Sequence, residues 1–248
     1  MHVLFGILFY VAFLLLVVGL LFKIKQYAQT PAPLKIPTTP APVTKTGVVW
    51  RLITEVVFFN SLWKSNKWIW IFGWLFHLAL LLAFFRHLRY VIPDDAAMYF
   101  LVNNWFVLTV GKYAGWLMLF GLGGLLARRI FVDRVRYISS PSDFAMLLLI
   151  IGIAASGVLV SFIFKDAYAV LQLKAFVLGL LTFNLQPIPD NGLIIAHLVM
   201  VLVLMVIFPV SKLLHAPGVF FSPTRNQVDN PREQRHIAPW ARKLESNN

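Results

Sequence analysis

The chain has 248 residues, of which 59% are hydrophobic and 15% aromatic, while only 13% are charged. This composition excludes an ordinary soluble domain, in which about a quarter of the residues carry charge, and it predicts a protein embedded in a lipid bilayer. The chain has 22 Lys and Arg, 10 Asp and Glu, and no cysteine, so it cannot ligate an iron-sulfur cluster through thiolates, attach a c-type haem or form a disulfide.

Five stretches are long and apolar enough to cross a bilayer, which takes about 20 residues as a helix. They cover residues 3–22, 68–90, 105–127, 144–164 and 192–210. Only Met1 and His2 precede the first stretch, and neither gives the positive segment of a signal peptide, so we expect this helix to be retained. The predicted fold class is therefore an all-α membrane protein with five transmembrane helices.

The distribution of basic residues favours one orientation in the membrane. Seventeen of the 22 lie in residues 23–67, 128–143 and 212–248, which five spans place on the same side. Cytoplasmic loops carry an excess of Lys and Arg, so this pattern predicts a periplasmic N-terminus and a cytoplasmic C-terminus in a bacterial inner (cytoplasmic) membrane. Most of the net charge of +12 then reflects topology, and we expect no nucleic acid partner.

The segments between the spans divide into three kinds. Residues 28–45 are rich in Pro, Ala and Thr and predict an extended cytoplasmic linker without packed structure. Residues 48–62 are amphipathic and are expected to lie in the cytoplasmic interface. Residues 168–183 form a similar apolar stretch on the outer side, too short for a sixth span.

The chain is expected to divide near residue 215. Residues 1–215 would form the membrane domain and residues 216–248 a cytoplasmic C-terminal arm. The arm is mostly polar and contains four prolines, yet it carries two Phe and Trp240. Such a segment is typical of an extended arm that binds a partner protein, and a disordered tail is the alternative.

Four of the six histidines fall on two predicted helices. His77 and His87 lie on the second span, and His197 and His215 lie on the fifth span and its extension. Because these helices run in opposite directions, depth pairs His77 with His215 on the cytoplasmic side and His87 with His197 on the outer side. A six-coordinate b haem requires two imidazoles, presented across a gap at one depth, as its axial ligands. We therefore predict two b haems between the second and fifth helices.

Two observations bear on this pairing. The spacings of 10 and 18 residues correspond to roughly 15 and 27 Å along an α-helix, so tilt and a distortion at Pro209 must absorb the difference. Two alternatives are histidines that bond other helices and a zinc or proton site. Such metal and proton sites normally include carboxylates, and the five predicted spans contain no Asp or Glu.

Four basic residues are candidates for binding the cofactors. Arg86 and Arg89 flank His87, and Lys212 lies one helical turn before His215, so all three could pair with haem propionates. Lys112 is the single charge within the third span and could donate to a quinone oxygen. For each residue the alternative is anchoring at the lipid interface.

Three segments, LFHLALLLAFFRHLRY, LLARRIFVDRVRYISSPSD and AHLVMVLVLMVIFPVSKLLH, resemble the gamma subunit family of respiratory nitrate reductases, which are membrane di-haem cytochromes b. The resemblance covers residues 1–220. It implies five transmembrane helices, two b haems with the pairing given above, and a quinone site beside the outer haem.

The linker and the C-terminal arm are more similar to the cytochrome b subunit, the M subunit, of the Dsr membrane complex of sulfur metabolism. This resemblance implies a cytoplasmic iron-sulfur subunit similar to heterodisulfide reductase, together with other membrane and periplasmic redox subunits. We therefore expect an electron-transfer subunit of a complex that exchanges electrons with menaquinone or another quinone, with no bond-making catalytic residue of its own. A nitrate reductase gamma subunit and a haem-free anchor or transporter are the alternatives.

Overall fold

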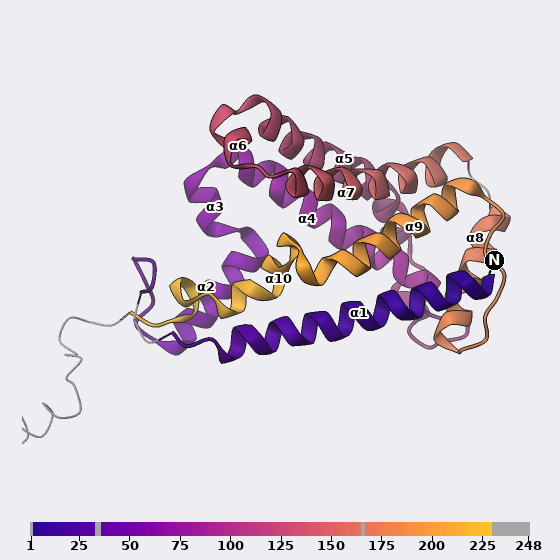
Figure 1. Cartoon of the computed structure of the whole chain (residues 1–248), viewed down its shortest axis with the longest axis horizontal. Coiled ribbons are helices and arrows are strands. Elements are labelled where there is room, and N and C mark those ends of the chain that lie inside the picture. Colours follow the sequence, from indigo (N-terminus) through magenta and orange to yellow (C-terminus); the bar gives the residue numbers. More distant parts are fainter. Residues whose placement is uncertain (1, 33–35, 165–166, 230–248) are drawn as a thin grey trace, which may run out of the picture. The chain divides into compact units, whose positions relative to one another are not determined.

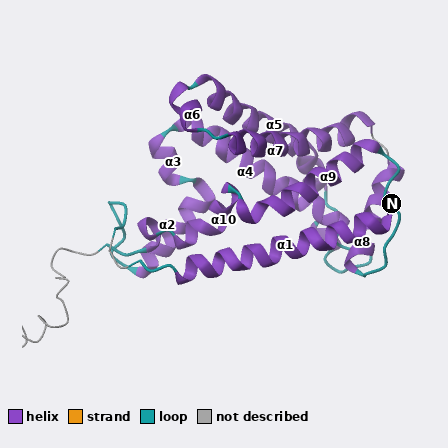
Figure 2. Ribbon diagram, in the orientation of Figure 1, coloured by secondary structure: helices purple, strands orange, loops and turns teal. Residues whose placement is uncertain are grey.

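A computed structural model describes residues 2–32, 36–164 and 167–229. Within these ranges every regular element is a helix, as the composition predicted (Figure 2). The chain divides into two compact units. The first contains the residues up to Phe22 and Phe59–Leu213, and the second contains Lys23–Phe58 and the residues from Leu214 onward. Residues 230–248, which include most of the predicted C-terminal arm with His236 and Trp240, lie outside the described residues.

Five helices are long and apolar enough to span a membrane, which confirms the predicted number. Three of them end in short turns of 3-10 or π type, as the extended bounds show. The five are α1 (His2–Gln29), α4 (Lys67–His87, extended to Tyr90), α5 (Trp105–Phe131), α7 (Pro141–Leu159, extended to Phe164) and α9 (Gly192–Ile207, extended to Val210) (Figure 1).

Side-chain caps fix where three of these helices begin. The carboxamide oxygens of Asn66, Asn104 and Asn191 accept hydrogen bonds from backbone N–H groups in the first turns of α4, α5 and α9, at 3.0 to 3.2 Å. A helix N-terminus has unpaired N–H groups, and a cap of this kind stabilises it by about 1 kcal/mol. Each of these polar caps lies at the beginning of an apolar helix, at an end that is expected to face water.

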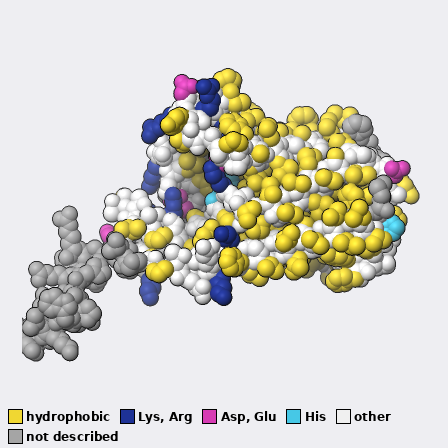
Figure 3. Space-filling model, viewed as in Figure 1, with side chains coloured by type: hydrophobic (Ala, Val, Ile, Leu, Met, Phe, Trp, Pro, Cys, Tyr) yellow, Lys and Arg dark blue, Asp and Glu magenta, His cyan; other side chains and the backbone are white. Residues whose placement is uncertain are grey.

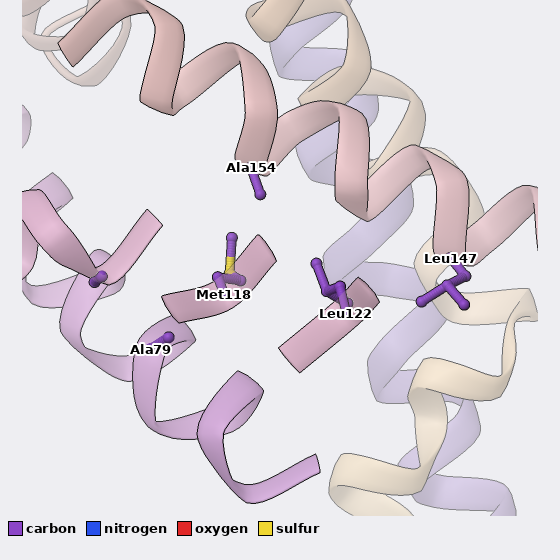
Figure 4. Packing of buried hydrophobic residues seen from close by; sticks show 6 residues of the cluster. Ala79, Met118, Leu122, Leu147 and Ala154 are labelled. Carbon is purple, nitrogen blue, oxygen red and sulfur yellow. The ribbon is translucent and has the colours of Figure 1, made fainter. Parts of the chain in front are cut away.

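Helices α4, α5 and α7 pack around one cluster of small and apolar side chains. Figure 4 shows Met118 of α5 and Ala154 of α7 pointing toward one another, with Ala79 of α4 close to Met118. The α4 backbone comes unusually near α5 at Gly121, where an added Cβ would lie 2.8 Å from the Phe72 carbonyl oxygen. Small residues allow such close approach between membrane helices, where packing rather than water exclusion drives association.

A second cluster joins α1 and α9 to the short helix α8 (Ala167–Leu181). Phe176 of α8 is fully buried there, and Phe9 of α1 meets it edge-on at 5.9 Å between ring centres. The Tyr10 hydroxyl donates to the Leu180 carbonyl oxygen at 2.8 Å. The short apolar stretch expected at residues 168–183 is thus a packed helix, and its position on the outer side stays a prediction. Hydrophobic side chains cover much of the visible surface of the spanning helices (Figure 3).

The chain leaves regular α-helical geometry after α9, as Pro209 predicted. A 3-10 turn covers Phe208–Val210, Ser211 is extended, and a further 3-10 turn covers Lys212–Leu214. The short helix α10 (His215–Gly218) begins after this turn, in the second unit. His215 therefore does not lie on a straight continuation of α9.

The amphipathic stretch at residues 48–62 is divided rather than continuous. Helix α2 (Lys45–Phe58) ends just before Phe59, whose φ of 50° is left-handed, and α3 (Asn60–Ser65) follows in the first unit. A left-handed residue breaks the α-helical hydrogen-bond ladder, so one helix becomes two. Another short helix, α6 (Asp133–Ile138), connects α5 to α7.

The second unit brings the linker and the start of the C-terminal arm together. The Thr38 N–H donates to the Thr224 carbonyl at 2.9 Å, and the Asp229 N–H donates to the Pro42 carbonyl at 2.7 Å. Helix α11 (Pro223–Asn226) packs against α2. The expectation that the linker lacks packed structure is thus wrong for its described part after residue 35, because backbone groups of the arm pair with it. Linker residues 33–35 lie outside the described residues.

Candidate functional site

The structure brings the rings of His87 of α4 and His197 of α9 close together and parallel within the first unit. Their ring centres are 6.4 Å apart and their ring planes differ by 8°. His87 is exposed and His197 is half-buried. Helix α4 packs along α5 and α9 along α7, whereas α4 and α9 make few close contacts with each other. The two imidazoles therefore lie close together although their helices make few contacts with each other.

Hydrogen bonds determine which ring nitrogen of each histidine carries the proton. The Nδ1 of His87 lies 2.6 Å from the Ala83 carbonyl oxygen. A carbonyl only accepts, so this Nδ1 must donate, and Nε2 keeps its lone pair. The Nδ1 of His197 lies 2.8 Å from the Ser156 hydroxyl, whose own proton goes to the Ile153 carbonyl. Both imidazoles are thus held in the tautomer that binds metal through Nε2.

The separation of the two rings fits a bis-imidazole iron site. An imidazole nitrogen lies about 2 Å from a transition metal and its ring centre about 1 Å further back, so two ligands on opposite faces of one metal ion place their ring centres about 6 Å apart. The distance of 6.4 Å agrees with this sum. The described residues contain no group of three or more His, Asp or Glu placed to hold a metal ion.

The other two predicted ligands fall in different units. His77 lies in the first half of α4, where its Nδ1 is 2.7 Å from the Gly73 carbonyl oxygen and its ring contacts Phe59 and Phe76 edge-on. The Nδ1 of His77 therefore donates to a backbone carbonyl, as the Nδ1 of His87 does. His215 begins α10 in the second unit. The predicted pairing of His77 with His215 stays a prediction.

The two arginines beside His87 have different surroundings. The Arg86 guanidinium donates to the Leu108 carbonyl oxygen of α5 and joins the two helices. Arg89 donates to the Tyr90 hydroxyl at 2.7 Å and lies over its ring, yet its Nε is buried with no hydrogen-bond partner among the described residues. A buried N–H without an acceptor is costly. Arg89 is thus better suited than Arg86 to bind a propionate.

Lys212 has a protein carboxylate as its partner. Its ammonium lies 2.6 Å from one carboxylate oxygen of Asp143 and 2.7 Å from the other. Asp143 is buried at the start of α7, where it also accepts bonds from the backbone N–H and the hydroxyl of Ser140, both at 3.0 Å. Arg129 of α5 lies 3.8 Å away. This arrangement joins the ends of three spanning helices, and the propionate role of Lys212 stays a prediction.

Lys112 lies in the second turn of α5, near the end of the helix bundle that holds His87. Its ammonium is 4.8 Å from the ring centre of Phe162, in the π turn that follows α7. Tyr113 contacts the same ring at 5.5 Å. A cation over an aromatic face gains about 1 kcal/mol at partly exposed sites. The cation–π contact gives Lys112 a structural role, and its predicted contact with a quinone stays a prediction.

A loop beside this end of the bundle is held to α8. The Lys174 ammonium lies 2.5 Å from the Asp94 carboxylate and 4.7 Å from the centre of the Tyr99 ring. The hydrogen bond from Lys174 lowers the pKa of Asp94, and the hydrogen bond to Asp94 raises the pKa of Tyr99. Helix α8 also packs against the turn at Leu88–Tyr90, directly after His87.

Two functional candidates were not identified from the sequence. Ser156 is a polar residue within a span, a position that normally requires a reason, and this signal could have identified it. Asp143 lies just outside the apolar core of the same span, and nothing in its local sequence shows that it pairs with Lys212, which is 69 residues away.

Comparison with known proteins shows the family to which the chain belongs. The family model described as nitrate reductase gamma subunit matches residues 43–243, a range that includes His77, His87, His197 and His215. The chain belongs to the nitrate reductase gamma subunit family.

Two similar family relatives come from archaea. A protein of Archaeoglobus fulgidus named Hdr-like menaquinol oxidoreductase cytochrome b-like subunit is 32% identical over 96% of this chain and 83% of its own length. A protein of the same name from Archaeoglobus profundus is 30% identical over 93% of this chain and 80% of its own length. The resemblance predicted from the histidine-bearing segments is thus confirmed at the level of the family.

Proposed function

We propose that this protein is the cytochrome b subunit of a membrane complex that carries electrons between menaquinone and a cytoplasmic iron-sulfur subunit. The geometry of His87 and His197 is the observation that carries the proposal: both rings present Nε2, and their separation suits one iron between them. Haem b, bound at this pair and at His77 with His215, would supply one-electron transfer across the membrane.

Different side chains would bind the haem iron, the haem propionate and the quinone. His87 and His197 would hold the outer haem, and Arg89, with its buried Nε, would bind a propionate beside it. Lys112 would orient a quinone near the same end of the bundle, where protons leaving a quinol can reach the outer solution. This end would face outside because the opposite ends of the spanning helices carry Arg128, Arg129 and Lys212, and cytoplasmic segments are rich in basic residues.

The partner is inferred from the relatives and from the cytoplasmic segments. The relatives are named as subunits of Hdr-like menaquinol oxidoreductases, and the linker and arm resemble those of the Dsr complex of sulfur metabolism. A cytoplasmic iron-sulfur subunit similar to heterodisulfide reductase would accept or supply electrons at the proposed inner haem, bound by His77 and His215. Further membrane and periplasmic redox subunits would complete the complex.

A haem assay on the purified protein tests the proposal. The reduced-minus-oxidised spectrum is expected to show b-type bands, and a pyridine haemochrome assay is expected to give two haems per chain. A preparation without haem would instead support a haem-free anchor or transporter. Sequencing the cytoplasmic subunit that co-purifies then separates sulfur from nitrate metabolism, because the family name itself favours a nitrate reductase gamma subunit as the second candidate.

A further inference from the structure

Ser156 is a buried polar residue on α7, a helix that carries none of the four histidines. The residue is 4% exposed. Its hydroxyl lies 2.8 Å from Nδ1 of His197 on α9, and it donates to the Ile153 carbonyl oxygen at 3.0 Å. The neighbouring Gly157 also faces this ring, because a Cβ added there would lie 3.6 Å from His197 Cε1. Helix α7 thus approaches the imidazole along Ser156 and Gly157.

The Ser156 hydroxyl can take part in the hydrogen bond with His197 only as the acceptor. It has a single proton, and that proton is given to the Ile153 carbonyl. The serine oxygen must therefore accept from His197 Nδ1–H. If the hydroxyl instead donated to Nδ1, Nε2 would carry the ring proton and could not bind a metal. The carbonyl of Ile153 selects the first arrangement.

This partner differs in kind from those of His77 and His87. Both of those rings donate to a backbone carbonyl four residues earlier on their own helix, Gly73 and Ala83. Such bonds form wherever the helix forms, and no side-chain substitution removes the acceptor. His197 instead contacts a side chain 41 residues away on another helix, the Ser156 hydroxyl, and its ring also interacts with the Ile153 backbone carbonyl of that helix.

We propose that Ser156 is a positioning residue for the outer haem. It holds the His197 ring in place and thereby sets the midpoint potential of the iron that His197 ligates. This inference rests on the proposed function, in which His87 and His197 are the axial ligands. A group that accepts a hydrogen bond from a ligating imidazole makes the ring a stronger electron donor. Stronger donation stabilises ferric over ferrous iron, so loss of the hydroxyl raises the midpoint potential of that haem.

The experiment compares Ser156→Ala with Ser156→Thr, which keeps a hydroxyl, and with the control Ser161→Ala, a serine five residues further along the same span. Each full-length protein is titrated potentiometrically while both b-haem spectra are followed. The spectrum of His87→Ala identifies the outer haem. Unaltered protein is measured first, and if it contains no haem, the proposed function has failed rather than this inference.

The expected result is an upward shift of the outer midpoint potential in Ser156→Ala, with the inner potential unchanged and with both controls close to the unaltered protein. If Ser156→Ala loses the outer haem, its retention in Ser156→Thr supports the role of the hydroxyl. The proposal is overturned if both potentials are unchanged in Ser156→Ala, if only the inner one shifts, or if Ser156→Thr reproduces the effect of Ser156→Ala.

Discussion

The two predicted haem sites differ in how the fold brings their ligands together. His87 and His197 belong to one compact unit, and their rings lie parallel with centres 6.4 Å apart. His77 belongs to that unit, whereas His215 belongs to the unit formed by the linker and the arm. The outer pairing therefore follows from the packing of spanning helices, and the inner pairing depends on a segment that leaves the helical path after Pro209.

The largest expected effect is at the outer pair. His87→Ala and His197→Ala should each remove the same b haem, about half of the total, because a single imidazole leaves the iron with one axial ligand. The pyridine haemochrome assay and low-temperature difference spectra measure this loss. His2→Ala, at the start of α1, is the matched control and should keep both haems.

The inner pair tests whether the antiparallel register holds across the two units. His77→Ala and His215→Ala should each remove the second haem and leave the first. The same spectra resolve the two components. If His77→Ala and His87→Ala abolished one and the same component, the pairing by depth would be wrong.

A substitution at Lys112 tests electron transfer from the quinol independently of haem binding. In Lys112→Ala, reduction of both haems by a menaquinol analogue should slow at least about tenfold, the scale of losing one charged hydrogen bond to the substrate, while the absorption spectra stay intact. Stopped-flow reduction by the quinol, compared with reduction by dithionite, measures the difference. An unchanged quinol rate would leave Lys112 with only its contact to Phe162. Tyr113→Phe, which keeps the ring against Phe162, is the matched control.

Substitutions at Asp143 and Lys212 test which contacts stabilise the end of the bundle opposite to His87. Asp143→Asn should destabilise the protein by about 1–3 kcal/mol, because a buried carboxylate loses charge-assisted bonds. Lys212→Gln should cost less, since the Lys212 side chain is 74% exposed and its ion pair is screened by water. Thermal unfolding in detergent, followed by tryptophan fluorescence, ranks the two variants. A spectral change of the inner haem in Lys212→Gln alone would favour the predicted propionate contact.

The smallest effect concerns the exposed loop contact to α8. Lys174 lowers the pKa of Asp94 below its usual 3.8. A carboxyl with a lowered pKa stabilises the folded state above its unfolded value, and this contribution is lost as pH falls through the folded value. Asp94→Asn should therefore lower the Tm slightly near neutral pH and leave it unchanged at strongly acidic pH. A difference that persisted in acid would contradict this origin. Asp95→Asn is the neighbouring control.

Much of the fold follows directly from the sequence. The five spans were predicted within a few residues of their observed ends, except that α1 continues to Gln29. Pro209 was expected to distort the fifth helix, and the chain does leave α-helical geometry there. These features are local, since hydrophobic length and the missing proline N–H act regardless of what packs nearby.

Other features depend on contacts between distant residues. Nothing in the local sequence predicts the left-handed Phe59 that divides residues 48–62 into two helices, or the pairing of the linker with residues 224 and 229. The partner of Lys212 was expected to be a propionate, and the structure places Asp143 against it. A lone charge in a sequence does not reveal its partner, because the partner can lie on any helix of similar depth.

The sequence by itself determined that His77 and His87 lie on one spanning helix and His197 on another, and it predicts the depth of each one. It could do so because helical rise converts residue number into height across a bilayer of fixed thickness. Only the tertiary structure decided the rotation of α4 and α9 that turns His87 toward His197, and the hydroxyl of Ser156 that holds His197 in its metal-binding tautomer. Rotation about a helix axis is set by the side chains packed around the whole bundle, and no single helix contains that information.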